Sequence, residues 1–172
     1  AAAESSIDLA IRLTEETMEQ IRSLAHAMRT PSLDVLGLDV TLAGLCKEFG
    51  ERTGLHIDYQ GADIDHLPEM VAISLYRVVQ EGLTNVARHA RATQVVVTLR
   101  QEGDDVLLTM EDNGQGFDAQ RVMQGPSQGI GLAGLHERMQ TLGGSLAVFS
   151  EPGGGARLTA RVPLTAAVSS QP

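Results

Sequence analysis

The first part of the chain carries an apolar repeat that predicts a helix packed against another helix. Over residues 7–28, apolar or small side chains recur in steps of four and three, while Glu, Gln and Arg side chains lie off this seam. We expect Pro31 to end the helix and residues 31–37 to form a connector. A second apolar repeat follows over residues 38–49 and is closed by two glycines. The seam favours a helix from a bundle or dimer; a helix folded onto the rest of its own chain is the alternative.

The pattern changes near Gly54, where we place a domain boundary. Beyond it, stretches with a period of two alternate with helical ones. In order, the expected elements are a strand at residues 55–59, a helix from Pro68 to about Ala90, strands at 94–100 and 106–111 joined by a turn at Gly103, a loop over 112–131, a helix at 132–142 stopped by Gly143 and Gly144, and a hairpin of strands at 145–150 and 156–162. Small or apolar side chains alternate with Arg and Thr in the last strand, which predicts a sheet with one covered and one open face.

Composition narrows the class of protein. Hydrophobic residues make up 42% of the 172 residues, which is enough for a core, and the formal net charge is -9. An acidic chain repels nucleic-acid phosphate, so we expect no nucleic-acid partner. Cys46 is the only cysteine, which excludes an intramolecular disulfide and fits a reducing, cytoplasmic compartment. Because no apolar run approaches the roughly 18 residues of a membrane span, we expect no direct membrane contact.

One predicted helix carries polar residues that can bind a metal and phosphate. Glu81, Asn85, Arg88 and His89 fall within an arc of about 100°, opposite the apolar stripe of this helix. Taken alone, they have a simpler interpretation as an ordinary solvated face. However, an amide oxygen is a ligand for a hard cation such as Mg²⁺, whose bound waters a Glu can orient. Arginine and histidine at the same place can contact phosphate oxygens.

Three glycine-rich motifs follow, each of them weak when taken alone. Residues 112–117 read Asp-Asn-Gly-Gln-Gly-Phe after a strand, where glycines let the backbone approach a flat ligand and Asp112 can accept a hydrogen bond from an exocyclic amine. Residues 129–135 enter a helix, whose free N–H groups favour an anion. Residues 153–156 precede the last strand. The simpler interpretations are a turn, close helix packing and a hairpin turn, respectively.

Together, these four motifs resemble the catalytic and ATP-binding domain of sensor histidine kinases, within the wider ATPase group of gyrase, Hsp90 and MutL. Residues 80–90 read Gln-Glu-Gly-Leu-Thr-Asn-Val-Ala-Arg-His-Ala and resemble the N box, and the glycine motifs resemble the three glycine boxes. Ala156 stands where Thr is usual, which removes one hydroxyl contact. The resemblance covers residues 7–164. It implies an α+β fold, the two-layer α/β sandwich called the Bergerat fold, in which helices back a mixed, largely antiparallel sheet and an N-terminal helical segment precedes it.

The resemblance also implies the ligands and the residues that hold them. The implied cofactors are ATP and Mg²⁺, with Asp112 on the adenine amine, Asn85 on the metal, and Glu81 as the candidate catalytic residue, next to the metal through a water. The residues expected to bind ATP are Asn85, Arg88, His89, Asp112, Gly114, Gly116, Gly129, Ile130, Gly131, Leu132, Gly155 and Ala156. Of these, Gly129 and Gly131 are expected to provide hinges and backbone donors for a lid over the nucleotide.

Three further segments narrow the resemblance to kinases of the nitrate-sensor and DesK-like type. Residues 24–38 resemble the Leu-Arg-Pro and Gly-Leu signature of their second dimerisation helix, although Thr30 stands between the Arg and the Pro. The Glu-Arg-Met sequence at residues 137–139 and the short lid at residues 118–128 fit the same subfamily.

The expected organisation is a partial dimerisation segment at residues 1–53, a catalytic domain at 54–164 and a disordered tail at 165–172. In such kinases the phosphorylated histidine lies on a first dimerisation helix and is followed by an acidic residue, and we expect that helix to be missing here. His26 lacks the acidic neighbour. We therefore expect no phosphoacceptor in this chain and no autophosphorylation by the chain alone.

The implied function is transfer of the γ-phosphoryl group of ATP to that histidine, for relay to a response regulator. The implied partners are this regulator and, in the intact kinase, a second copy joined through the helical bundle. The parent protein would be cytoplasmic or membrane-anchored. The alternatives are an anti-sigma-factor-type serine kinase, which lacks the dimerisation signature, an ATP-binding regulatory module without catalysis, and a gyrase-like ATPase.

Overall fold

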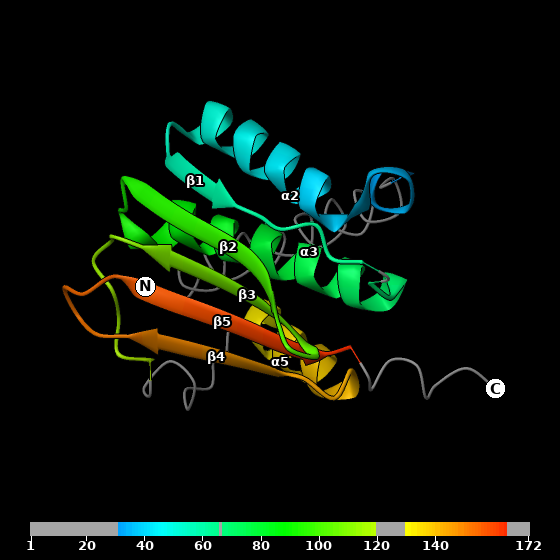
Figure 1. Ribbon diagram of the computed structural model, residues 1–172. Coiled ribbons are helices and arrows are strands. Elements are labelled where there is room, and N and C mark those ends of the chain that lie inside the picture. Colours follow the sequence, from blue (N-terminus) through cyan, green and yellow to red (C-terminus); the bar gives the residue numbers. More distant parts are fainter. Residues whose placement is uncertain (1–30, 66, 120–129, 165–172) are drawn as a thin grey trace, which may run out of the picture.

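Five strands form one sheet, and the helices lie against it (Figure 1). The structure, a computed structural model, describes residues 31–65, 67–119 and 130–164. In chain order the elements are α2 (Pro31–Thr53), β1 (His56–Gln60), α3 (Glu69–Asn85), the π-helical turn η1 (Val86–Ala90), β2 (Gln94–Glu102), β3 (Asp105–Asp112), α5 (Ile130–Thr141), β4 (Ser145–Ser150) and β5 (Ala156–Pro163). The predicted α+β fold is confirmed.

The sheet is mixed and has the strand order β1-β2-β3-β5-β4. β1 pairs with β2 in parallel, through the crossover that contains α3, and all other neighbouring strands are antiparallel. β2 and β3 form a tight hairpin in which Glu102 pairs with Asp105, so the turn at Gly103 is shorter than predicted. All five expected strands are present, with ends within two residues of the predicted ones.

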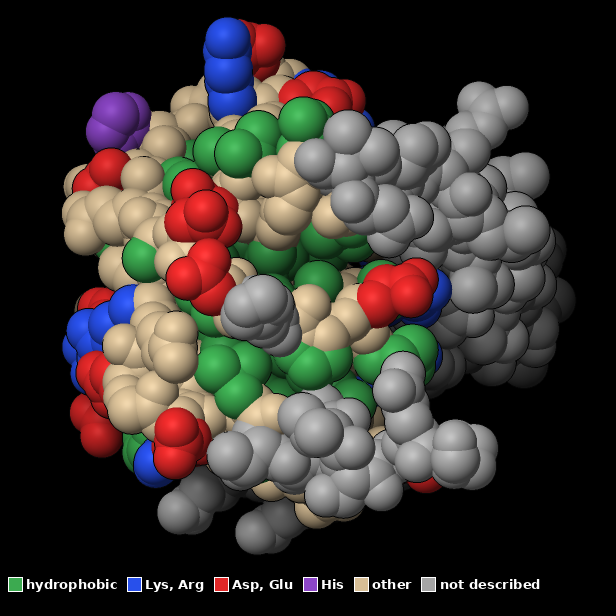
Figure 2. Space-filling model, turned by 45° about the vertical axis from the view of Figure 1, so that its right-hand side comes forward, with side chains coloured by type: hydrophobic (Ala, Val, Ile, Leu, Met, Phe, Trp, Pro, Cys, Tyr) green, Lys and Arg blue, Asp and Glu red, His purple; other side chains and the backbone are tan. Residues whose placement is uncertain are grey.

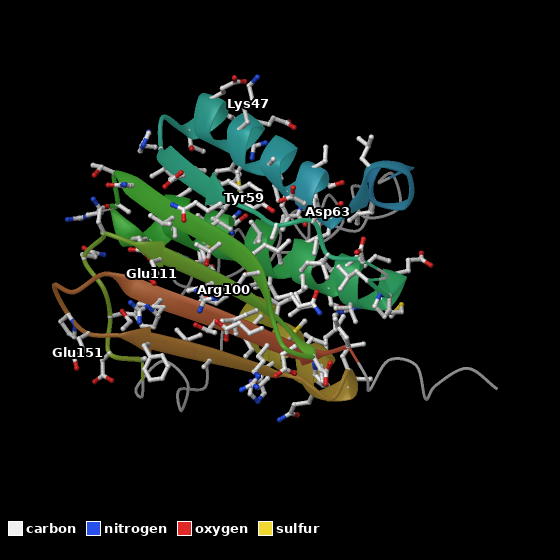
Figure 3. The ribbon with its side chains drawn as sticks, in the orientation of Figure 1. Lys47, Tyr59, Asp63, Arg100, Glu111 and Glu151 are labelled. Atoms are coloured by element: carbon white, nitrogen blue, oxygen red, sulfur yellow. The ribbon has the colours of Figure 1, made fainter. Side chains whose placement is uncertain are left out.

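The two faces of the sheet differ in chemistry. The buried side chains at alternate positions of its central strands are Val95, Val97, Leu99, Val106, Leu108, Met110, Leu158, Ala160 and Val162. The opposite face is open, and Figure 3 shows Arg100 and Glu111 on it. On this face Arg157 forms an ion pair with Glu111 at 2.9 Å, and Arg161 forms one with Asp105. The alternation predicted for the last strand is therefore confirmed.

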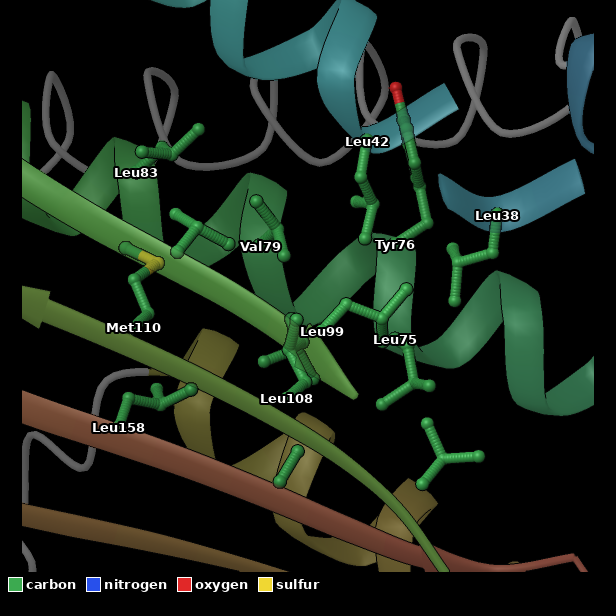
Figure 4. Close-up of a cluster of buried hydrophobic side chains, with 14 of the residues drawn as sticks. Leu38, Leu42, Leu75, Tyr76, Val79, Leu83, Leu99, Leu108, Met110 and Leu158 are labelled. Carbon is green, nitrogen blue, oxygen red and sulfur yellow. The ribbon is translucent and has the colours of Figure 1, made fainter. Parts of the chain in front are cut away.

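The apolar stripe of α3 fills the space between the helices and the sheet. Its fully buried members are Val71, Leu75, Val79 and Leu83. Figure 4 shows this stripe next to Leu99 of β2 and Leu108 of β3. Each such side chain contributes about 1.5–3 kcal/mol relative to an exposed one. The core thus fixes α3 on the sheet, as the helical period predicted.

The predicted connector at residues 31–37 is wrong, because α2 begins at Pro31. Proline fits the first turn of a helix, where its missing N–H group has no intrahelical acceptor. Gly37 interrupts α2 with a φ of 76° and a ψ of 172°, a backbone conformation open almost only to glycine, and it produces a kink. The two residues that predict a break in the helix therefore mark its start and its kink.

The second half of α2 shares the core of the α/β layers. Its buried side chains in the common hydrophobic cluster are Leu38, Leu42, Cys46 and Phe49. Figure 4 shows Leu38 and Leu42 facing α3. Burial raises the pKa of the Cys46 thiol to about 12, so the thiol stays protonated at neutral pH. The domain boundary near Gly54 remains a prediction, and the helix before that point packs against the layers after it.

Helix α5 begins at Ile130, two residues earlier than predicted. It ends in a Schellman motif, in which the Gly144 N–H donates to the Met139 carbonyl and the Gly143 N–H donates to the Gln140 carbonyl, both at 2.9 Å. Gly143 has a φ of 70°, which glycine adopts without strain. The predicted stop at this pair of glycines is confirmed.

Several predicted features lie outside the described residues: the apolar seam at 7–28, most of the lid at 118–128 and the tail at 165–172. In the part of the chain that the structure describes, no helix has both the length and the apolar character needed to cross a bilayer. Figure 2 shows more acidic than basic side chains on the face that it presents, in keeping with the formal net charge of -9.

Candidate nucleotide site

The last turns of α3 carry the predicted metal ligand. Glu81 and Asn85 lie one turn apart and are half-buried, and the Asn85 amide nitrogen contacts Glu81 Oε1 at 3.5 Å. This contact uses Nδ2 and leaves the amide oxygen Oδ1 for a cation. Gly82 brings the helix close to the sheet, because a Cβ there would lie 2.7 Å from Cε of Met110. Since Met110 is two residues before Asp112, this packing places the turn near the end of β3.

The helix does not continue regularly to Ala90 as predicted. It widens into the π-helical turn η1, and Arg91 ends it in the left-handed conformation with a φ of 53°. A π turn has more residues per turn than an α-helix, so the angular positions of Arg88 and His89 relative to Glu81 and Asn85 differ from those of a regular helix. Both side chains are exposed on η1, and their contact with phosphate stays a prediction. Single π turns are frequent at functional sites.

Asp112 ends β3 in a turn that orients its carboxylate. Oδ1 accepts a hydrogen bond from the Gly114 N–H at 2.8 Å, which is an Asx turn. Among the described residues, no donor meets the second oxygen, Oδ2. A Cβ at position 114 would overlap the carbonyl oxygen of Ala90, so glycine is needed for the loop to lie this close to η1. The half-buried carboxylate is thus held in place with one oxygen left to accept a hydrogen bond.

The third glycine motif lies directly against the first. In the pairing of β3 with β5, Asp112 stands opposite Ala156. Gly155 has a φ of 70°, and a Cβ there would overlap the carbonyl oxygen of Asp112. Gly116 has a φ of 61°, and a Cβ there would overlap the carbonyl oxygen of Glu151. Both positions therefore require glycine for its conformation and for space.

The second glycine motif starts α5. Ile130, Gly131 and Leu132 form the first turn of this helix, and Gly129 lies outside the described residues. The first N–H groups of a helix have no intrahelical acceptor and carry a partial positive charge, which favours an anion. α5 packs beside α3, the helix of Asn85. The role of this motif toward phosphate stays a prediction.

Two side chains hold the glycine loops in ways that the sequence did not reveal. Asn113 Oδ1 accepts two backbone N–H bonds from Thr93 and Gln94, at 2.9 and 3.0 Å, and its Nδ2 donates to Thr93 Oγ1 at 3.0 Å. Ser150 Oγ accepts from the Phe117 N–H at 2.9 Å and donates to the Gly155 carbonyl at 2.6 Å. Asp-Asn-Gly after a strand signals a tight turn. No local signal identifies Thr93 and Gln94 as partners of Asn113, or Phe117 as a partner of Ser150, because these residues lie 19 to 33 positions away in the sequence.

The donors of the site fit a metal that is shared with phosphate. Over the described ranges there is no group of three or more His, Cys, Asp or Glu side chains able to hold a metal ion by itself. The amide oxygen of Asn85 next to the Glu81 carboxylate is a small, hard donor set. Mg²⁺ keeps several waters and often takes substrate phosphates as ligands, so it needs few protein ligands.

The layers, the strand order and the paired glycine loops define an α/β domain whose mixed sheet is open on one face. A family model described as "Histidine kinase-, DNA gyrase B-, and HSP90-like ATPase" matches residues 70–166, more than half of the chain. The chain belongs to this family, and membership implies ATP as a ligand.

Individual relatives include sensor kinases. The chain is 32% identical over 155 residues to the signal transduction histidine-protein kinase/phosphatase DegS of Brevibacillus brevis. The aligned region covers 90% of this chain and 39% of that protein. The chain is 37% identical over 163 residues to the sensor histidine kinase MctS of Rhizobium johnstonii, covering 94% and 35%. The solved histidine kinase domain of a blue-light activated histidine kinase from Erythrobacter litoralis has a TM-score of 0.61 at 25% identity, covering 74% of this chain and 61% of that one. The chain therefore spans less than half the length of these two curated relatives.

Proposed function

We propose that the chain binds ATP with Mg²⁺ and transfers the γ-phosphoryl group to a histidine on a dimerisation helix. The observation that carries the proposal is the Asp112 carboxylate, which is tied through Oδ1 to Gly114 and keeps Oδ2 to accept the adenine amino group. Its position opposite Ala156 and against Gly155 supports a glycine-lined place for the base. The similarity to sensor histidine kinases supports the reaction.

Different residues bind the adenine end and the phosphate end of ATP. Asp112 selects adenine, because the amino group of adenine donates a hydrogen bond where the keto group of guanine cannot. At the phosphate end, Asn85 Oδ1 holds the cation, and Glu81 orients a bound water or the attacking imidazole. Mg²⁺ supplies charge neutralisation, which matters for phosphate bound to a chain with a formal net charge of -9.

Further contacts to the phosphates would come from backbone and cationic groups. We expect the backbone N–H groups of residues 129–132 to contact the phosphates, because the first N–H groups of a helix such as α5 favour an anion. Arg88 and His89 on η1 would add charge-assisted hydrogen bonds. Because phosphoryl transfer depends mainly on positioning and charge neutralisation, we assign no covalent role to the residues of the nucleotide site themselves.

The transfer breaks the bond between the γ-phosphorus and the β,γ-bridging oxygen and forms a phosphorus–nitrogen bond to imidazole, with ADP as the leaving group. The acceptor would come from a first dimerisation helix of the parent kinase, and the phosphoryl group would pass to an aspartate of a response regulator. The signature at residues 24–38 supports the nitrate-sensor and DesK-like subfamily, in which two copies associate through a helical bundle. We place this domain in the cytoplasm, with residues 1–53 and 54–164 as its dimerisation and catalytic parts.

Replacing Asp112 with Asn is expected to weaken ATP binding about 10- to 100-fold, about 1.4–2.7 kcal/mol. The Asn oxygen can keep the bond from Gly114, but its amide hydrogens then face the adenine amino group, so two donors meet. The same change should improve GTP binding relative to ATP. Calorimetric titration with both nucleotides measures this, with Asp104→Asn in the exposed β2–β3 turn as the matched control. Equal ATP affinity in the Asp112 variant and the control would reject the base site.

The reaction itself is tested by mixing the chain with a helical hairpin that carries an acceptor histidine, together with radiolabelled ATP and Mg²⁺. We expect acid-labile phosphate on the hairpin and none on the chain alone. Acid-stable phosphate on a serine substrate would favour the serine-kinase alternative. Nucleotide binding without transfer would favour a regulatory module, and steady ADP release without a hairpin would favour a gyrase-like ATPase.

A further inference from the structure

Gln115 binds the end of the helix that carries Asn85. Its side-chain Nε2 donates to the His89 carbonyl at 2.8 Å, and its backbone N–H donates to the Ala90 carbonyl, also at 2.8 Å. The last carbonyls of a helix have no intrahelical donor, and here the chain turns away at Arg91. One residue of the first glycine loop thus satisfies two consecutive carbonyls at the end of η1.

The same residue is tied to the hairpin on the other side of the loop. The Gln115 carbonyl accepts a hydrogen bond from the Gly153 N–H at 2.6 Å. The glycines on either side of it lie close to these same two parts of the fold, because a Cβ at Gly114 would overlap Ala90 and a Cβ at Gly116 would overlap Glu151. Gln115 therefore joins three parts of the fold: the end of η1, the end of β3 and the β4–β5 turn.

We infer that Gln115 is a positioning residue that fixes the spacing between the metal end and the base end of the nucleotide site. The inference rests on the proposed function. Asn85 directly precedes η1, whose last carbonyls Gln115 binds, and Asp112 lies three residues before Gln115 in the same loop. A nucleotide that spans both residues needs them at one separation, and small misplacements of binding groups weaken binding and slow transfer.

Removal of the hydrogen bond from the Gln115 side chain should affect positioning without destabilising the fold. The Gln115 side chain is exposed, so water can solvate the His89 carbonyl when the amide is removed. The backbone bond to Ala90 remains in any variant. Loss of the amide should therefore loosen the register of η1 on the glycine loop and leave the hydrophobic core as it is.

The test compares Gln115→Met with Gln101→Met. Methionine keeps the length of the side chain and removes the donor. Gln101 is a matched control, since it is also exposed and its Nε2 also donates to a turn carbonyl, that of Gly103, at 3.0 Å, but in the β2–β3 hairpin. The affinities for ATP with Mg²⁺ and for adenosine alone are measured by NMR titration, and stability is measured by urea unfolding.

We expect Gln115→Met to weaken binding of ATP with Mg²⁺ about 5- to 20-fold, to change adenosine affinity less than twofold, and to unfold at the same urea concentration as Gln101→Met. Adenosine uses the base end alone, so a purely structural loss would lower both affinities together. Equal losses for both ligands, or an unchanged affinity for ATP with Mg²⁺, would overturn the positioning role while the nucleotide site stands. Failure of the unmodified chain to bind ATP with Mg²⁺ would overturn the proposed function and this inference with it.

Discussion

Replacing Asn85 with Ala is expected to lower the affinity for ATP with Mg²⁺ by at least about 100-fold, about 2.7 kcal/mol. Asn85 supplies the amide oxygen that we assign to the cation, and few protein ligands are available to compensate for its loss. The variant should also lose the dependence of ATP affinity on Mg²⁺. Calorimetric titration of ATP with and without Mg²⁺ measures both effects.

The stability of the Asn85 variant should change little, because the side chain is only half-buried and alanine favours a helix. Thr84→Ala is the control next to it on α3. That change removes only the bond from Thr84 Oγ1 to the Gln80 carbonyl, 2.8 Å long, and should leave ATP affinity unchanged. If both variants bind ATP with Mg²⁺ as tightly as the unmodified chain, the cation is held elsewhere.

The second large effect is expected from Gly116→Ala, which should destabilise the domain by about 3 kcal/mol or more. Gly116 has a φ of 61°, and an added Cβ would overlap the backbone carbonyl of Glu151. Backbone atoms cannot move aside as a flexible side chain does, so the β4–β5 turn must shift. Because that turn also holds Gly155 against Asp112, nucleotide binding should be lost as well.

Gly103→Ala separates conformation from space. Gly103 has nearly the same φ, 62°, but no atom lies within 4 Å of the position of an added Cβ. Gly103→Ala should therefore lower the free energy of unfolding only by the cost of the left-handed backbone conformation, about 1 kcal/mol. Urea unfolding of the two variants gives the difference directly. Equal losses of stability would show that the close approach of Gly116 to Glu151 contributes nothing.

Much of the fold follows from local patterns. The alternation in β5 and the apolar stripe of α3 are confirmed, because burial on one face imposes a period of two on a strand and of about 3.6 on a helix. The predicted connector at residues 31–37 is wrong, although Pro31 and Gly37 are typical of a break in a helix. Both residues are compatible with helical segments, the first at a start and the second at a kink. Proline and glycine indicate an irregular position in the sequence, but they do not show whether a helix starts, kinks or ends there.

The position of α2 was not determined by its own repeat. Leu38, Leu42 and Cys46 predict a helix with one apolar face, but a partner helix and the α/β core would cover that face equally well. Only the packed structure decides that the core covers it. The sequence also does not predict the π turn at η1, because the spacing of apolar residues up to Ala90 is compatible with a regular helix.

By itself, the sequence determined which residues we propose for the chemistry: Asn85 and Glu81 on one helix, Asp112 at a strand end, and the glycines around them. These follow from residue type and short spacing, which depend on neighbours a few positions away. Only the tertiary structure decided that Asp112 stands opposite Ala156 and that Gln115 binds the end of η1. Such contacts join residues tens of positions apart, and they form only when strand register and helix packing are fixed by burial of the core.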